Sequence, residues 1–203
     1  MLGSTGPRRA VFKALPEGVD VRNMPVIGNP NAPHVLLEMM DYTCKHCRKL
    51  HPHLVAAVDR YGDQLAVVIY NVPLSKKCNF KVKRDYPGKK YACDYAHLSL
   101  AVWKLAPQHY LDFHQWLLLD EEKAPSISKV KRRARELAGN QVLLDKDIRA
   151  DNTRRINTQV KAFSRLNSGL PVLLLQDSAL RGVPDESEKL FEYLESKLDL
   201  QPL

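Results

Sequence analysis

A short apolar run that leads into two cysteines decides the fold of this chain. The stretch is Val35-Leu36-Leu37-Glu38-Met39-Met40-Asp41-Tyr42-Thr43-Cys44-Lys45-His46-Cys47, and a helix-like segment, residues 48–58, follows it. A strand, two cysteines two residues apart and a helix are the parts of a dithiol redox site. The first sulfur then lies at a helix N-terminus, where backbone N–H groups and the helix dipole favour a thiolate. The pattern predicts Cys44 as nucleophile and Cys47 as the resolving thiol.

The same cysteine spacing also occurs in metal sites. Half of a zinc site has the same pattern of two cysteines separated by two residues, and His51 and His53 lie close enough in sequence to complete a Cys2His2 set. Neither a second pair of this spacing nor a paired HxxxH is present, which favours redox chemistry over zinc. Two inert core cysteines are a third possibility. A c-type haem is disfavoured, because Arg48 rather than histidine follows Cys47.

Size and composition indicate one globular domain, with or without an insertion. The chain has 203 residues, of which 44% are hydrophobic and 27% charged, and its formal net charge is +8. It has no apolar run long enough to span a membrane, and residues 1–9 lack the apolar core of a signal peptide. We interpret the excess positive charge as lysines and arginines on solvent-exposed faces of helices. No nucleic-acid module is recognisable, whereas an acidic partner or a membrane surface stays open.

A second cysteine pair, Cys78 and Cys93, flanks a polar, lysine-rich segment. We expect a structural disulfide here, which would stabilise the fold by about 3 kcal/mol in the chain-entropy model. Such bonds persist only in oxidising compartments. The alternative is two separate buried thiols in a cytosolic protein.

Periodicity and turn signals predict the order of the elements. Residues 1–23 are expected to form a tail, with 11–21 as a possible short edge strand. The expected strands are 35–40, 65–72, 172–175 and 180–183. The expected helices are 45–61, 91–106, 108–120, 126–138, 141–151, 152–166 and 185–198. The first strand, helix and second strand make a β–α–β unit, whose strands pair in parallel.

This order resembles the thioredoxin fold of the DsbA-like thiol–disulfide oxidoreductases, which carry an inserted helical domain. The resemblance rests on residues 28–47, which are similar to the family's segment up to its cysteine pair, and on Ser168-Gly169-Leu170-Pro171-Val172, similar to its cis-proline loop. It implies an α/β fold with a central mixed sheet flanked by helices. The implied division is a tail at 1–23, a thioredoxin-like domain at 24–92 and 168–203, and an all-helical insert at 93–167.

The resemblance also implies roles for individual residues. Pro171 would be in the cis form and face the dithiol, and the backbone of Leu170 would pair with an extended substrate. Glu38 would relay protons to the buried cysteine; otherwise it reaches solvent at a sheet edge or pairs with a basic residue. Lys45 and Leu170 depart from the residues common in the family at these places. Lys45 and partly charged His46 would favour the Cys44 thiolate, or else only face solvent.

The function expected on this basis is disulfide exchange with cysteine-containing proteins through Cys44 and Cys47, outside the cytoplasm. A membrane-bound or soluble redox partner would recycle the dithiol, and no cofactor, metal or nucleic acid is expected. One alternative is a soft-metal or iron–sulfur module, with a third ligand from His51 or from another chain. The other is a redox-inert recognition domain on the same fold.

Overall fold

A five-stranded mixed sheet forms the centre of the computed structural model, which describes residues 8–203. Its strands, in spatial order, are β3 (Val26–Gly28), β5 (Leu65–Asn71), β4 (His34–Met40), β6 (Val172–Leu174) and β7 (Ala179–Arg181). Strand β4 pairs in parallel with β5 and antiparallel with β6. The central position of β4 and β5 explains their continuous apolar sequences, because both of their faces are covered. The expected thioredoxin-like fold is confirmed.

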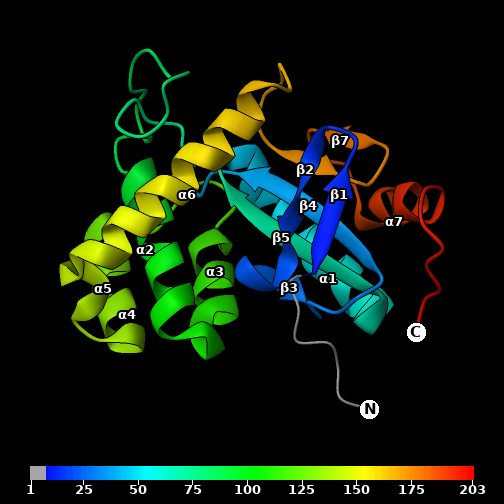
Figure 1. The fold of residues 1–203 in the computed structure, drawn as a ribbon, viewed down its shortest axis with the longest axis horizontal. Helices are drawn as coiled ribbons and strands as arrows, with labels where there is room; N and C mark the ends of the chain where they lie inside the picture. Colours follow the sequence, from blue (N-terminus) through cyan, green and yellow to red (C-terminus); the bar gives the residue numbers. More distant parts are fainter. Residues whose placement is uncertain (1–7) are drawn as a thin grey trace.

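Two layers cover the sheet (Figure 1). Helices α1 (Lys45–Tyr61) and α7 (Ser187–Glu195) pack with one face through apolar side chains such as Leu54 and Leu190. The opposite face is covered by a β-hairpin and by part of α6. Side chains alternate between the faces of a strand, so Glu38 points to the same face as Leu36 and Met40, the face under α1.

The hairpin corrects the expected N-terminal tail. Strands β1 (Arg9–Phe12) and β2 (Leu15–Asp20) pair antiparallel as a separate two-stranded sheet, and a 3-10 helix, Val21–Asn23, follows. The buried side chains of Phe12 and Val19 hold the hairpin on the central sheet. The prediction of a tail is therefore wrong for residues 9–23, because their apolar side chains find a long-range partner. The part of that prediction on residues 1–7 lies outside the described residues.

The helices between β5 and β6 are α2 (Ala92–Leu105), α3 (Tyr110–Leu118), α4 (Ile127–Ala138), α5 (Gln141–Leu144) and α6 (Lys146–Ser164). They agree with the expected helices except at one break. The chain turns at Asp145, whose carboxylate caps α6 by accepting a hydrogen bond of 2.9 Å from the Ile148 N–H. The expected helices 141–151 and 152–166 are thus a short α5 and a long α6. None of the helices in the described residues is long and apolar enough to cross a membrane.

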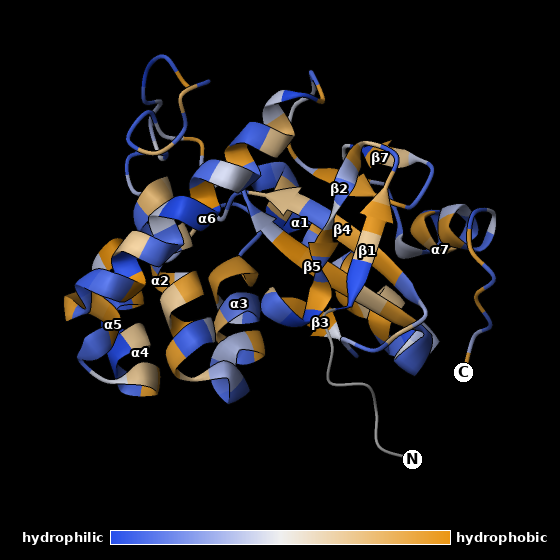
Figure 2. Ribbon diagram, viewed as in Figure 1, coloured by the Kyte–Doolittle hydropathy of each residue, from blue (hydrophilic) through white to orange (hydrophobic). Residues whose placement is uncertain are grey.

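A loop of residues 75–91 connects β5 to α2 and projects from the body of the molecule (Figure 1). Figure 2 shows that it is mainly hydrophilic, in contrast to the apolar strands of the sheet. The Cys78–Cys93 disulfide is formed, with Cα atoms 6.0 Å apart, and ties the loop to the first turn of α2. The alternative of two free thiols at these positions is excluded by this bond. We call residues 75–91 the basic loop.

Candidate active site

The dithiol lies where β4 ends and α1 begins. Cys44 is the N-cap residue of α1, and its N–H donates to the carbonyl oxygen of Asp41 at 3.0 Å. Both cysteines are free thiols, and both are largely covered. Cys44 is 6% exposed and Cys47 is fully buried, so only Cys44 is within reach of another molecule. The higher exposure of Cys44 is the order that its expected role as nucleophile requires; the roles themselves stay a prediction.

The two thiols have opposite shifts in pKa. The pKa of Cys44 is lowered to about 7, chiefly because the Cys47 side chain hydrogen-bonds to its sulfur, with the Cys47 backbone N–H and Lys89 adding to the effect against burial and Asp41. The contribution of the Cys47 N–H is the helix N-terminus effect that the sequence predicted. Burial is the main cause that raises the pKa of Cys47. At neutral pH the first sulfur is therefore partly thiolate, while the second keeps its proton.

The loop before β6 faces this dithiol. The Leu170–Pro171 peptide bond is cis, as the sequence motif implied. The carbonyl oxygen of Leu170 lies 4.0 Å from Sγ of Cys44, so the loop and Cys44 touch although 126 residues separate them. The backbone at Leu170 consequently lies beside the reactive sulfur.

Glu38 is buried under the dithiol. It occupies the central strand, opposite Ile69 of β5 and Leu173 of β6, and its side chain is 0% exposed. Within the described residues neither carboxyl oxygen has a hydrogen-bond partner. Burial, with the nearby Cys44 sulfur adding to it, raises the pKa of Glu38 to about 8. The alternatives of a solvent-reaching or ion-paired glutamate are thus wrong, because β4 is the middle strand.

Lys89 of the basic loop lowers the pKa of Cys44, whereas Lys45, between the two cysteines, is paired with another residue. The Lys89 ammonium donates a hydrogen bond to the carbonyl oxygen of Thr43, the residue directly before Cys44. Lys45 instead points to Glu122, with Nζ 2.7 Å from the carboxylate oxygen. His46 is exposed to solvent. Sequence patterns did not indicate Lys89, since nothing local connects residue 89 with residue 44.

Asp41 joins the start of the basic loop to the same turn. Its carboxylate accepts hydrogen bonds from the N–H groups of Thr43, at 2.7 Å, and Leu74, at 3.0 Å. Together with the Lys89 contact, this fixes both ends of the loop beside the dithiol. Asp41 was not among the residues singled out from the sequence, although a buried acid directly after a strand is a detectable signal.

Arg48 connects the first turn of α1 to the helical insert. Its side chain is buried and donates to the carbonyl oxygens of Tyr42, Leu117, Asp120 and Lys123 at 2.5 to 2.9 Å. Only Arg presents enough donors in a fixed fork to satisfy four carbonyl groups. Arg48 therefore holds the turn before Cys44 against the end of α3.

A buried polar cluster lies on the other side of Tyr42. The Tyr42 hydroxyl is 2.5 Å from Oγ of Ser99 and 2.7 Å from Nδ1 of His114, which also lies 3.3 Å from the Tyr110 hydroxyl. Burial lowers the pKa of His114 well below its usual value, so its ring is neutral. Tyr42 packs in the same core cluster as Cys44 and Cys47.

The two histidines that follow the dithiol in sequence are engaged elsewhere. His51 contacts the ring of His114, with centroids 5.0 Å apart, and His53 Nδ1 is 2.8 Å from the Ser187 hydroxyl. No group of three or more His, Cys, Asp or Glu side chains in the described residues lies close enough to hold a metal ion. The interpretation in which His51 completes a three-ligand site is therefore not supported.

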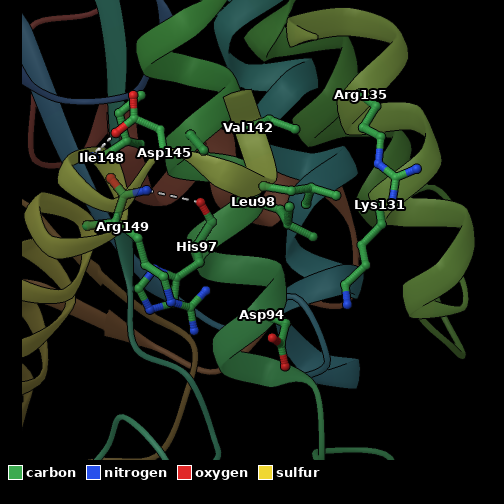
Figure 3. A pocket seen from close by; sticks show the side chains of 12 residues that line it. Asp94, His97, Leu98, Lys131, Arg135, Val142, Asp145, Ile148 and Arg149 are labelled. Atoms are coloured by element: carbon green, nitrogen blue, oxygen red, sulfur yellow. Dashed lines mark hydrogen bonds between the residues drawn. The ribbon is translucent and has the colours of Figure 1, made fainter. Parts of the chain in front are cut away.

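A separate pocket lies in the helical insert, away from the dithiol (Figure 3). It has a volume of about 200 Å³ and is bounded by α2, α4, α5 and α6. Figure 3 shows Lys131 and Arg135 on one side and His97 and Arg149 on the other, with Leu98 between them. Its described lining residues include neither Cys44 nor Cys47, so it is not part of the redox site.

Comparison with known proteins agrees with this architecture. A thioredoxin family model matches residues 20–98, which contain the hairpin's end, the dithiol and the first turns of α2. No curated protein matches the chain. Among solved structures, a linker-deletion variant of ScsC from Proteus mirabilis shares 22% identity at a TM-score of 0.69, over 87% of this chain and 74% of its own.

Two further solved structures align with this chain over most of their own length. A periplasmic thioredoxin-like protein from Salmonella enterica serovar Typhimurium is 22% identical, with a TM-score of 0.66, 87% of this chain covered and 90% of that one. The thiol-disulfide exchange protein α-DsbA2 from Wolbachia pipientis is 20% identical, with a TM-score of 0.68 and coverage of 85% and 86%. The proline loop beside the dithiol and the helical insert complete the picture: this chain has the thioredoxin fold, with a set of helices inserted between β5 and β6.

Proposed function

We propose that this protein is a thiol–disulfide oxidoreductase that exchanges disulfides with protein cysteines through Cys44 and Cys47. One observation carries the proposal. The more accessible sulfur has a pKa of about 7 and lies 4.0 Å from the Leu170 carbonyl oxygen at the cis-proline. A thiolate at a helix N-terminus is a reactive nucleophile and a good leaving group, and the adjacent backbone can pair with an extended substrate.

The exchange needs only the groups already described, apart from the substrate. A substrate thiolate attacks Sγ of Cys44 in the oxidised enzyme, and the Cys44–Cys47 bond breaks as the mixed disulfide forms. The departing Cys47 sulfur takes the proton of the Glu38 carboxyl, which holds it up to a pKa of about 8. A second substrate thiolate then attacks the substrate sulfur and releases Cys44 as a thiolate. The substrate has lost two electrons as its disulfide forms, and the enzyme dithiol has gained them.

Three further proposals concern the domain boundaries, the location of the protein and its redox partner. We propose residues 24–92 and 168–203, with the hairpin of residues 9–23 packed on their sheet, as the catalytic domain and 93–167 as its insert. We place the protein outside the cytoplasm, because the Cys78–Cys93 bond persists only under oxidising conditions. The dithiol formed in each cycle must be reoxidised, or the disulfide re-reduced, by a membrane-bound or soluble redox partner.

Trapping the mixed disulfide tests the proposal. Cys47→Ser removes only the resolving step, so it should accumulate a reducible adduct with a cysteine-containing peptide, whereas Cys44→Ser should form none. Full-length protein is incubated with a peptide disulfide and analysed by mass spectrometry without reductant. Equal trapping by both variants, or by neither, contradicts the proposal. Metal analysis of the wild-type protein, with free-thiol titration, separates it from a metal module.

A further inference from the structure

The basic loop presents an unusually concentrated positive surface at the rim of the dithiol. Its residues 75–91 contain seven lysines and arginines and one acid, Asp85. Asp85 is engaged within the loop, since its carboxylate accepts hydrogen bonds from the Ser75 hydroxyl at 2.7 Å and from the Lys76 N–H at 3.0 Å. Among residues 8–203, no carboxylate forms an ion pair with a lysine or arginine of the loop. The positive charge of the loop is therefore available to another molecule.

Three exposed aromatic rings lie between these charges. Phe80, Tyr86 and Tyr91 are 63%, 54% and 37% exposed, and each has a cation of the loop over its ring. The pairs are Lys81 on Phe80 at 5.9 Å, Arg84 on Tyr86 at 5.1 Å and Lys90 on Tyr91 at 5.3 Å from the ring centroid. In these cation–π contacts the positively charged group of a lysine or arginine is attracted to the face of the ring. The surface of the loop therefore combines apolar rings with positively charged side chains.

The basic loop is held beside Cys44, where a substrate cysteine would react, by three contacts. Lys89 is bound to the Thr43 carbonyl, Asp41 holds the Leu74 N–H, and the Cys78–Cys93 disulfide anchors the loop to α2. Figure 1 shows the rest of the loop projecting beyond α2 and away from the sheet. A polypeptide with its cysteine at Cys44 therefore has flanking residues within reach of this surface.

We propose that the basic loop recruits substrate polypeptides with acidic residues beside the reactive cysteine. This inference rests on the proposed function and names its substrate class. Carboxylates match the cations, and apolar side chains of the same segment pack on the three rings. An anionic membrane surface is the weaker fit, because the rings would have to leave their cations to enter the acyl layer. Charges at a rim act mainly on the rate of association, so the preference should depend on salt.

The test compares three peptides that differ only in the residues flanking one cysteine: glutamate, glutamine or lysine. The second-order rate constant for reduction of the Cys44–Cys47 disulfide is measured for each with full-length protein. Each value is divided by the rate of the same peptide with the uncharged 2-hydroxyethyl disulfide, because neighbouring charges alter the thiol itself. We expect the acidic peptide to react roughly tenfold faster than the basic one at low salt, and the ratio to approach one at high salt.

Matched variants locate the effect. Lys81→Gln/Lys83→Gln/Arg84→Gln removes three charges from the loop and leaves Lys89 in place. Lys129→Gln/Lys131→Gln/Arg132→Gln removes three exposed charges from α4, at the other end of the insert in Figure 1. Only the loop variant should lose the preference for the acidic peptide, whereas the α4 variant should keep it.

The outcomes separate the two proposals. No exchange with any peptide refutes the proposed function itself. Exchange without charge preference, or a preference that the loop variant keeps, overturns the inference on the substrate class and leaves the proposed function intact. Sedimentation with phosphatidylglycerol vesicles is the third measurement. Binding that the loop variant loses, with equal peptide rates throughout, would assign the loop to a membrane and overturn the inference.

Discussion

Lys89 donates a hydrogen bond to the carbonyl oxygen of Thr43, so a cation from a distant loop contacts the residue directly before Cys44. Lys45, which is adjacent to Cys44 in sequence, is directed to Glu122 instead. The loop that carries Lys89 is itself held in place by the Cys78–Cys93 disulfide. The pKa of Cys44 therefore depends on a loop far away in the sequence rather than on the lysine next to Cys44.

Replacing Lys89 should weaken the Cys44 thiolate. The charge of Lys89 lowers the pKa of Cys44, so Lys89→Met should raise that pKa above about 7. The thiolate fraction at neutral pH should fall by a factor of about two to five, since one nearby charge is lost. Ultraviolet thiolate absorbance against pH gives the value. Lys45→Met is the control and should change it less; the reverse order would show that Lys45 is the relevant cation.

Glu38→Gln should remove a proton donor for Cys47. The carboxyl of Glu38 is protonated below a pKa of about 8, so reduction of the enzyme disulfide should be slower in the variant, by on the order of 10²-fold. The ratio of wild-type to variant rate should be largest below pH 8 and decline above it. A ratio that does not change with pH would contradict the role in proton transfer.

The same substitution should change how stability depends on pH. The folded-state pKa of Glu38, about 8, is above its ordinary value of 4.5, so the folded protein holds this proton more tightly than the unfolded chain. Its contribution is fully present below about pH 4.5 and is lost as the pH rises through 8. Denaturant unfolding of reduced wild type should therefore show a decline across this window that Glu38→Gln lacks. An identical decline in both proteins would show that another group causes it.

Removing the second disulfide should affect both stability and the dithiol. Cys78→Ala/Cys93→Ala opens a loop with a sequence separation of 15 and should lower the free energy of unfolding by about 3 kcal/mol. Because the same loop carries Lys89, the pKa of Cys44 should also rise in the variant. Urea unfolding and thiolate titration check the two effects. A stable variant with an unchanged Cys44 pKa would show that the loop keeps its place without the bond.

Arg48→Met should destabilise the connection between α1 and the insert. The variant leaves four carbonyl groups without their donor, those of Tyr42, Leu117, Asp120 and Lys123. The expected loss is at least about 3 kcal/mol, because each buried acceptor loses a partner. Lys49→Met, on the same turn of α1 but only partly buried, serves as control. A loss equal to that of the control would show that solvent replaces the guanidinium.

The sequence alone determined the elements whose signals are local. The apolar run before Cys44, the two-residue cysteine spacing and the helix after it predicted β4, the dithiol and α1. The breaks at prolines located most helices of the insert. These features depend on periodicity, turn residues and helix ends, which are set by neighbours in the chain. The cis bond beside Cys44 came instead from the resemblance of residues 168–172 to the cis-proline loop of the DsbA-like family.

Only the tertiary structure decided the surroundings of the sulfur atoms. The pattern of residues 9–23 indicated no more than a short edge strand at 11–21, because β1 and β2 are short and their burial depends on a sheet formed by distant residues. The state of Glu38 depends on β4 being the middle strand, which follows from its pairing with β5 and β6. Lys89 and Arg48 act through hydrogen bonds to backbone carbonyls far away in the chain, 46 residues for Lys89 and 69 for the Leu117 carbonyl. Such contacts leave no periodic trace in the chain, because only folding brings the donor and the acceptor together.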